Sequence, residues 1–373
     1  MIKTFEVENF RLFDQIKINR ISNVNLIVGK NNAGKSALLE ALLLYVSRVS
    51  PDVIMKLLSS RQEQWSPSSE SYSMRLATTP VRHLFKNHKL PLITESGFRL
   101  SSQNDVDSIH VKTADYIQEE IDQRIIRRRL MPSELEHFDP DAKEYEICLV
   151  CDHGENTLRM LSLPDSFSGD IRRRMMFRET KSNTSSYQFI PTIGIDDYTA
   201  ASLWDSISLT DLESEVIKGL KLLDQSVSAI AFVANESRRD SAPRIPLVKI
   251  ENVEERVPLK SMGDGMTHVL QIILALVNSK NGTLVIDEFE NGLHWSIQEN
   301  VWRMVFELSD KLNVQVFAST HSRDCINGFE KAWNSNKDKG AFLRVYKENE
   351  VVSLKEYDLE LLSNSIETEV EVR

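Results

Sequence analysis

The sequence predicts an α/β fold with a mostly parallel core sheet, an antiparallel β lobe and an inserted helical region. Apolar strands alternate with helical segments near both ends of the chain, at residues 24–46 and 283–320. This alternation is typical of parallel sheets that carry helices on their faces. Residues 96–165 form short alternating segments that suit antiparallel strands. We therefore expect a core built from both ends of the chain, with an insertion between them. The expected parts are 1–95, 96–225 and 226–373.

The composition is that of a globular protein. Its 373 residues are 41% hydrophobic and 27% charged, enough for one large or two ordinary domains. No apolar run approaches the roughly 20 residues that a membrane helix needs, and the start MIKTFEVENF lacks a signal peptide's apolar core. Three cysteines are too few for a disulfide framework. We expect a cytoplasmic protein without a membrane partner. The net charge of −10 disfavours a surface broadly committed to nucleic acid, although a local basic patch remains open.

The N-terminal elements surround a glycine-containing loop. Residues 1–28 alternate as β segments, and NVNLIV at 23–28 is a short apolar strand that ends at a glycine. The loop GKNNAGKS follows at 29–36. ALLEALLLYVSRV at 37–49 contains strong helix formers and no breaker, which predicts a helix. Residues 50–95 mix helix with Ser/Pro-rich loop.

The middle of the chain contains segments of three kinds. QEEIDQRIIRRRL at 118–130 is predicted to be a charged helical piece among the strands. Residues 166–188 are polar and rich in breakers, so most of them are expected to form a mobile excursion. A helix is predicted over 211–224, where Thr210 and Glu213 form a capping box.

The C-terminal part again alternates between strands and helices. A strand at 229–235 and an irregular polar hairpin precede an apolar helix at 269–277. The remaining expected elements are a strand at 283–287, a helix at 296–312, a strand at 314–320 and a two-stranded tail at 342–357.

The loop GKNNAGKS fits the pattern G-x-x-x-x-G-K-[ST] at every fixed position. Gly29 and Gly34 let the backbone direct its N–H groups toward phosphates. Lys35 supplies a positive charge for the β- and γ-phosphates, and Ser36 is a ligand for Mg²⁺. The alternative is a turn that happens to hold a lysine, but the strand before it and the helix after it favour a nucleotide site. Further expected ATP-binding residues of this segment are Asn31, Asn32, Ala33 and Ala37.

A second motif, TLVIDEFENGLH at 283–294, is an apolar strand that ends in two acidic residues. Asp287 is placed to meet Mg²⁺ or its bound water, which is the Walker B role. Glu288 follows at the exit of the strand, where a glutamate can polarise the attacking water, so we assign it as general base. The alternative is an acidic loop after a buried strand.

The strand in VQVFASTHS at 314–322 ends next to His321. In a parallel sheet this histidine lies on the same edge as the phosphate loop, where it can hydrogen-bond the γ-phosphate or the attacking water. A lone histidine is more often structural. The order of the motifs along the chain favours the functional interpretation, and we count His321 with Glu288 and Lys35 as catalytic.

The stretch LKSMGDGMTHVL at 259–270 predicts a second place for a phosphate. Ser261, Gly263 and Gly265 lead into an apolar helix, and a helix N-terminus carries free N–H donors and a partial positive charge. The phosphate loop already wraps its own nucleotide. The second cradle would therefore serve a nucleotide held by another subunit. Two subunits facing head to tail would bury two ATP molecules, and hydrolysis would release them.

Together these motifs resemble an ATP-binding-cassette-type ATPase of the SMC/RecF superfamily, closest to OLD-like AAA ATPases. FEVENFRLFDQIKI resembles the opening strand with its Asn-Phe-Arg corner, and on that basis Arg11 joins the expected nucleotide-binding residues. KSMGDGM resembles the signature, DEFENGLH the Walker B motif and D-loop, and ASTHS the switch histidine. The stretches VRHLFKN and ETEVEVR extend the resemblance over nearly the whole chain.

The resemblance implies an ATP-driven homodimer, or a larger assembly of dimers, that works on or near DNA. OLD-like ATPases often belong to bacterial anti-phage systems and are paired with a nuclease. About 50 residues follow His321, against the ~100 or more of a typical domain, so any nuclease is expected to be a separate polypeptide. The alternatives are a RecF-like repair or DNA-clamp ATPase acting directly on DNA, and a nucleotide-gated scaffold with slow hydrolysis.

Three positions depart from the pattern of the superfamily. Met262 replaces the first glycine of the signature, and Asp264 follows the second, where its charge would repel a phosphate unless it points away. His294 stands where many cassettes have the D-loop aspartate.

Other charged and metal-like patterns remain open. Two arginine runs could form a DNA track or docking surface, although a solvated face is the usual explanation. Cys148 and Cys151 have zinc-like spacing, but no second pair exists, and residues three apart on a strand point to opposite faces. The runs are Arg124, Arg127, Arg128 and Arg129, then Arg172, Arg173, Arg174 and Arg178.

Overall fold

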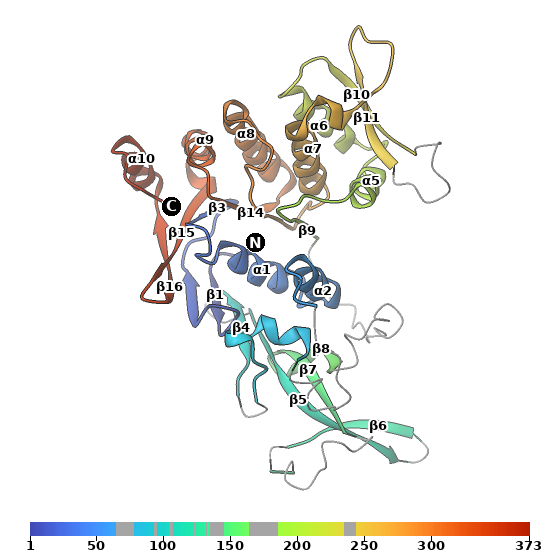
Figure 1. Cartoon of the computed structure of the whole chain (residues 1–373), viewed down its shortest axis with the longest axis vertical. Coiled ribbons are helices and arrows are strands. Elements are labelled where there is room, and N and C mark those ends of the chain that lie inside the picture. The colour runs from blue at the N-terminus through green and yellow to red at the C-terminus, as the bar shows by residue number, and fades with distance from the viewer. Residues whose placement is uncertain are drawn as a thin grey trace.

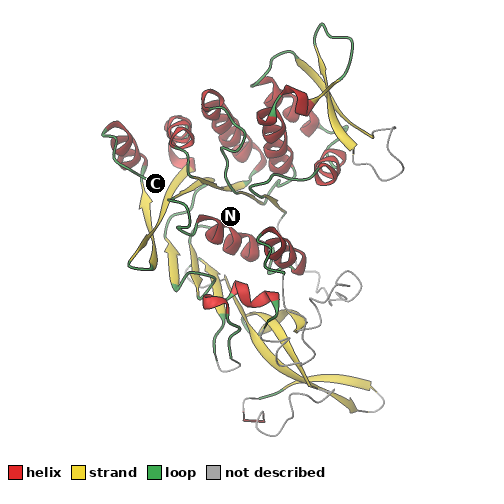
Figure 2. Cartoon of the chain, viewed as in Figure 1, coloured by secondary structure: helices red, strands yellow, loops and turns green. Residues whose placement is uncertain are grey.

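The computed structural model describes residues 1–64, 78–92, 95–103, 107–121, 124–131, 133–134, 145–163, 186–234 and 244–373. Figure 1 shows a row of helices, α7 to α10, above a central sheet, with α1 and α2 below that sheet. An antiparallel β lobe extends beneath α1 and α2, and Figure 2 shows that its strands form the lower part of the molecule. The predicted α/β architecture is confirmed.

The central sheet contains strands from both ends of the chain, as expected. Its order is β16-β15-β3-β14-β13-β9, and all strands from β15 to β9 run parallel. In β3, Val24, Leu26 and Val28 face one core cluster while Ile27 faces the other, so the strand is buried on both sides. The strands are β3 Val24–Val28, β9 Tyr187–Ile190, β13 Thr283–Ile286, β14 Gln315–Thr320, β15 Gly340–Glu348 and β16 Val351–Tyr357.

Strand β9 was not predicted. Most of the expected polar excursion at 166–188 lies outside the described residues, but its last two residues already belong to β9. Ile190 pairs in register with Ile286, and Ile286 pairs with Ala318. The carboxyl ends of these parallel strands therefore open at one edge of the sheet. The loops that leave β3, β9, β13 and β14 meet at this edge.

The helices cover both faces of the central sheet. One core cluster contains the buried sides of α7, α8 and α9, and the other contains α1 and α2. Helix α6 begins after Thr210, whose hydroxyl accepts from the backbone N–H of Leu212, while Glu213 accepts from that of Leu209. The helices are α1 Lys35–Val46, α2 Pro51–Ser60, α5 Asp197–Asp205, α6 Asp211–Lys221, α7 Asp264–Val277, α8 Trp295–Leu312, α9 Arg323–Asn334 and α10 Leu359–Glu367. Short 3₁₀ turns are η1 Pro80–Leu84, η2 Lys86–His88, η5 Leu259–Met262 and η6 Lys337–Lys339.

A small antiparallel sheet lies next to α5, α6 and α7 (Figure 1). Its strands are β10 Val227–Ala234, β11 Arg244–Ile250 and β12 Val257–Pro258. The sheet confirms the predicted strand and hairpin that precede the apolar helix. Within the described ranges, no helix is long and apolar enough to cross a membrane.

The β lobe is antiparallel throughout, as predicted, with the order β2-β1-β4-β5-β7-β8 and β6 paired to β5. The lobe takes strands from both the 1–95 and the 96–225 parts. Its strands are β1 Phe5–Glu8, β2 Gln15–Ile18, β4 Phe98–Ser102, β5 Asp107–Ile121, β6 Arg124–Arg129, β7 Tyr145–His153 and β8 Asn156–Leu163.

The prediction of a helical piece at 118–130 was wrong. This segment contains the end of β5 and all of β6. The two strands pair antiparallel, with Tyr116 opposite Arg129 at one end and Ile121 opposite Arg124 at the other. Gln, Glu and Arg are good helix formers, but cross-strand pairing outweighs that local preference. Arg128, for example, contacts Glu119 of the facing strand at 3.1 Å.

A polar network joins the end of α1 to the β lobe. Asp107 accepts hydrogen bonds from Nη1 and Nη2 of Arg48, at 2.8 and 2.9 Å, and from the hydroxyl of Tyr45 at 2.8 Å. His153 of β7 lies 2.8 Å from the same carboxylate. These contacts connect the helix after the phosphate loop to the lobe.

Acidic pH is expected to weaken the polar network around Asp107. Although burial opposes ionisation, hydrogen bonds from Arg48 and Tyr45 lower the pKa of Asp107 to about 2 from the usual 3.8. A carboxylate with a depressed folded-state pKa stabilises the fold above its unfolded pKa, and the stabilisation is lost as the pH falls through the folded value. Urea unfolding of wild type should therefore lose stability between about pH 4 and about pH 2. Asp107→Asn should flatten that loss, and an unchanged pH dependence would contradict this role.

Candidate functional site

The phosphate loop connects β3 to α1 as predicted. Gly34 is the N-cap of α1 with φ of 112°, a left-handed conformation that favours glycine. At Gly29 the reason for glycine is close approach, because a Cβ atom would lie 2.3 Å from the carbonyl oxygen of Val345 in β15. Asn31 and Asn32 are exposed on the loop, whereas Ala33 is buried.

Lys35 is buried at the start of α1, with its ammonium group turned back into the loop. Its Nζ atom donates to the carbonyl oxygens of Gly29 at 2.8 Å and Lys30 at 3.2 Å. Burial lowers the pKa of Lys35, and the nearby carboxylates of Asp287, Glu288 and Glu290 oppose that shift. The hydrogen-bond partners of this ammonium group are neutral carbonyl oxygens. It can exchange them for phosphate oxygens, because hydrogen bonds between two charged groups are stronger.

Asp287 and Ser36 lie together, as predicted. Asp287 accepts hydrogen bonds from Ser36 at 3.2 Å, Ser319 at 2.5 Å and Thr192 at 3.2 Å. A carboxylate surrounded by three hydroxyl groups offers the hard oxygen donors that suit Mg²⁺. The residues therefore fit a divalent cation held by Ser36 and Asp287.

Thr192 was missed by the sequence reasoning. It follows β9, and its carbonyl oxygen accepts from Asn291 at 2.7 Å while its hydroxyl reaches Asp287. The signal was the short apolar run YQFI before Pro191. Four residues are too few for a periodicity argument, and the position becomes clear only when β9 pairs with β13.

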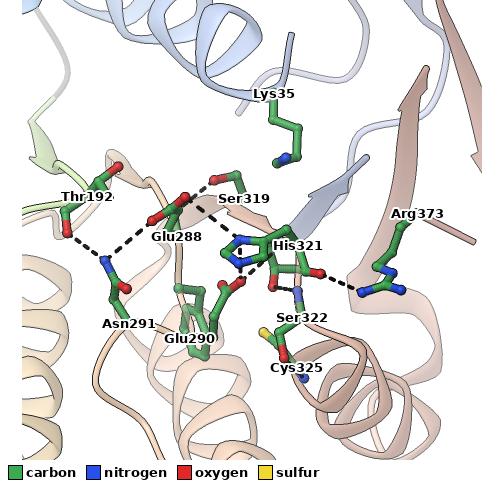
Figure 3. A network of polar contacts seen from close by, with 12 residues as sticks. Lys35, Thr192, Glu288, Glu290, Asn291, Ser319, His321, Ser322, Cys325 and Arg373 are labelled. Carbon is green, nitrogen blue, oxygen red and sulfur yellow. Dashed lines mark hydrogen bonds and ion pairs between the residues drawn. The ribbon is translucent and has the colours of Figure 1, made fainter. Parts of the chain in front are cut away.

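Glu288 leaves the sheet in a left-handed conformation, with φ of 57°. Non-glycine residues rarely adopt this conformation, and such strain is concentrated at functional sites. The backbone N–H of Glu288 donates to Ser319 Oγ at 2.9 Å, and Asn291 Nδ2 lies 3.5 Å from its carboxylate. Figure 3 shows the side chains of Glu288 and Glu290 beside His321, with Lys35 on the opposite side.

His321 lies at the end of β14, on the expected edge. Its Nδ1 atom is 3.1 Å from Glu290 Oε1 and 3.7 Å from Glu288 Oε1. Its backbone N–H donates to Glu290 at 2.9 Å, and Arg373 donates to its carbonyl oxygen at 3.2 Å (Figure 3). Glu290 and Arg373 were not predicted. They are far apart in sequence from His321, and only the folded chain brings them together.

The predicted signature segment begins with η5 and continues into α7. Gly263 is the N-cap with φ of 107°, and a Cβ atom there would meet no other atom within 4 Å. Ser261 is exposed and donates to the carbonyl oxygen of Pro258. Among the described residues, no hydrogen bond or ion pair connects 259–265 to the phosphate loop at 29–36.

We expected Gly265 to precede the helix, but this was wrong. Gly265 lies in the first turn of α7, which already begins at Asp264. A Cβ atom at Gly265 would lie 2.9 Å from the carbonyl oxygen of Gly292. The glycine therefore allows the first turn of α7 to pack against the loop that follows Asp287 and Glu288. His294, at the end of that loop, is the N-cap of α8 and accepts from the backbone N–H of Ser296.

Arg11 lies in a buried ion cluster. Its guanidinium contacts Glu40 of α1 and Glu63 at 2.8 Å, and donates to the carbonyl oxygen of His83 at 3.3 Å. Burial raises the pKa of Glu40, and Arg11 and Arg61 oppose that shift. In this conformation Arg11 connects the phosphate-loop helix to its neighbours, and its expected nucleotide contact stays a prediction.

Three arginines of the first run, all on β6, form ion pairs within their own lobe, and the side chain of Arg124 lies outside the described part of the structure. Arg127 contacts Glu146 at 3.4 Å, Arg128 contacts Glu134 at 2.9 Å, and Arg129 lies 3.9 Å from Asp152. These pairs support the solvated-face interpretation. The second run, Arg172, Arg173, Arg174 and Arg178, lies outside the described residues.

The two central cysteines do not form a metal site. Cys148 and Cys151 are buried in different core clusters, so they point to opposite faces of β7. Burial raises the pKa of Cys151 to about 12, which disfavours a thiolate, and raises that of Cys148 as well. The part of the chain that the structure describes contains no group of three or more His, Cys, Asp or Glu residues suited to a metal ion.

The fold, together with the residues at the carboxyl edge of the central sheet, defines a P-loop nucleotide-binding ATPase. Residues 1–326 match the AAA ATPase domain family, so the chain belongs to that family. It is 29% identical over 352 residues to an ATP/GTP phosphatase from Helicobacter pylori, covering 87% of this chain and 86% of the relative. It is 23% identical over 353 residues to the OLD nuclease of Thermus scotoductus, covering 91% of this chain and 62% of the nuclease.

The family and these two relatives confirm the predicted resemblance to OLD-like ATPases. Among solved structures, the SMC head bound to the C-winged helix domain of ScpA aligns with 97% of this chain and 99% of that chain. The TM-score is 0.48 and the sequence identity 11%.

Proposed function

We propose that this chain hydrolyses ATP at modest turnover between two copies of itself and gates a separately encoded effector. The observation that carries the proposal is the meeting of Lys35, Ser36, Asp287, Glu288 and His321 at one edge of the sheet. These residues supply a phosphate-binding cation, oxygen ligands, a base and a sensor for the γ-phosphate.

Each residue has a specific part in hydrolysis. Lys35 exchanges its carbonyl partners for β- and γ-phosphate oxygens. Ser36 and Asp287 would hold Mg²⁺, and the bound ion would neutralise negative charge on the phosphates. Glu288 orients the attacking water and accepts its proton. His321 contacts the γ-phosphate or that water.

The signature segment motivates the dimer. Ser261 is exposed, the space beside Gly263 is open, and neither is bonded to the chain's own phosphate loop. We propose that each segment contacts the ATP held by the other copy. The active form is then a homodimer or a larger assembly of dimers.

Mixing two inactive variants tests this arrangement. Lys35→Ala removes the cation from one wall of each composite site, and Ser261→Arg blocks the other wall. In a mixed dimer one site carries both defects and the other carries neither. Mixing should therefore restore ATP hydrolysis that each variant lacks alone. Without recovery, despite confirmed mixing of subunits, the composite site is wrong.

We propose a nuclease as the separate effector and anti-phage defence in the bacterial cytoplasm as the setting. The support for a nuclease is the similarity of this chain to the OLD nuclease of Thermus scotoductus, with 23% identity over 353 residues. Co-expression with the protein encoded next to this chain's gene tests the proposal by co-purification and ATP-dependent nuclease activity. A neighbour devoted to housekeeping repair would favour the RecF-like alternative, which the ion-paired arginines of β6 do not support.

A further inference from the structure

Glu290 makes the closest carboxylate contacts of the switch histidine. Its Oε1 atom accepts the backbone N–H of His321 at 2.9 Å and lies 3.1 Å from His321 Nδ1. The assigned base Glu288 is farther away, with 3.7 Å between its Oε1 atom and the same ring nitrogen. The imidazole therefore stands between two carboxylates, and its contact with Glu290 is the shorter of the two.

The surroundings of Glu290 indicate that its carboxylate does more than accept a backbone hydrogen bond from the loop. Its side chain is only 10% exposed, and its Oε2 atom is buried without a hydrogen-bond partner among the described residues. Burying an unpartnered carboxylate oxygen is costly. An uncharged amide would hold the backbone N–H of His321 at lower cost. The negative charge also acts on the nucleotide site, because Glu290 is one of the three carboxylates that oppose the lowering of the Lys35 pKa.

Arg373 fixes the same loop from the other side. Its guanidinium donates to the carbonyl oxygen of His321 at 3.2 Å and pairs with Glu371 at 2.9 Å. The backbone of His321 is therefore held at both its N–H and its carbonyl group. The orientation of the ring then depends on the partner of Nδ1.

We infer that Glu290 is the positioning residue of the switch histidine, an inference that rests on the proposed role of His321. Glu290 accepts the Nδ1–H group and so selects one tautomer, with Nε2 as the ring nitrogen available to the nucleotide. It also occupies the nitrogen that would otherwise pair with Glu288. That arrangement keeps the base free for the attacking water.

Two substitutions separate positioning from loop capping. Glu290→Gln keeps the volume and an oxygen acceptor for the backbone N–H but removes the charge, and Glu290→Ala removes both contacts. We expect the kcat for ATP hydrolysis to fall on the order of 10- to 100-fold in both variants, as for other groups that orient a reactive residue. KM and ATP affinity should stay within about twofold, because uniform binding is intact. Glu307→Gln, on the exposed side of α8, is the matched control.

The tautomer gives a readout that does not depend on hydrolysis. Nitrogen NMR of histidine-labelled, nucleotide-free protein should show Nδ1–H for His321, with His321→Asn to assign the signal. Glu290→Ala should lose that signature. A wild-type Nε2–H tautomer, or a kcat in Glu290→Gln equal to that of the Glu307→Gln control, would overturn the inference. If Glu288→Gln hydrolyses ATP normally while the tautomer is as expected, the assigned base fails and the positioning role stands.

Discussion

Glu288→Gln is expected to bind ATP and to hydrolyse it on the order of 10²- to 10⁴-fold more slowly than wild type. The amide preserves the size of the side chain but cannot accept the proton of the attacking water. The left-handed backbone of Glu288 and its bond to Ser319 do not involve the carboxylate, so the local fold should persist.

This variant should also remain in the ATP-bound, closed state, because hydrolysis is the step proposed to release the subunits. Phosphate release measures the first effect, and the lifetime of the ATP complex measures the second. Glu307→Gln serves as the control for loss of a glutamate charge. Equal phosphate release by Glu288→Gln and wild type would show that another group is the base.

Lys35→Ala is expected to weaken ATP binding by about two orders of magnitude. Hydrogen bonds to charged groups contribute about 1.5–3 kcal/mol each, and Lys35 is placed to make such bonds to two phosphates. Removal of the ammonium group also leaves the carboxylates of Asp287, Glu288 and Glu290 without their nearby cation.

Titration calorimetry with ATP and Mg²⁺ measures this loss of affinity. Lys56→Ala, on the exposed side of α2, is the matched control for charge. A Lys35→Ala variant that binds ATP as tightly as the control would contradict the assignment of the phosphate loop.

The local parts of the site were predictable from the sequence. The phosphate loop, Asp287 and His321 each lie where an apolar strand ends. Parallel pairing of β3, β13 and β14 was enough to place them on one edge. These predictions depend on a strand and the residue that follows it, and local patterning specifies both.

The parts that failed depend on contacts between distant segments. The end of β5 and β6 carry helix-forming residues, and their hairpin became visible only in the folded lobe. Thr192 follows a strand of four residues whose identity is fixed by pairing with β13. Glu290 belongs to a motif that the sequence did identify, but its function is defined by the position of His321.

Arg11 and Gly265 show the limits of motif transfer. The Asn-Phe-Arg corner is present, but Glu40 and Glu63 surround the arginine and hold it in an ion cluster. Gly265 belongs to the signature by sequence, yet its missing side chain makes room for Gly292. In both cases the motif identified the residue, but the contacts that explain its position come from distant parts of the chain.

The molar mass of Glu288→Gln, measured by light scattering with and without ATP and Mg²⁺, tests the central claim most directly. The account predicts that ATP doubles the mass from the single-chain value of 42.7 kDa, and that Ser261→Arg added to the same variant abolishes the doubling. A mass that stays at the single-chain value of 42.7 kDa while ATP is demonstrably bound would contradict an ATP molecule shared between two copies of this chain.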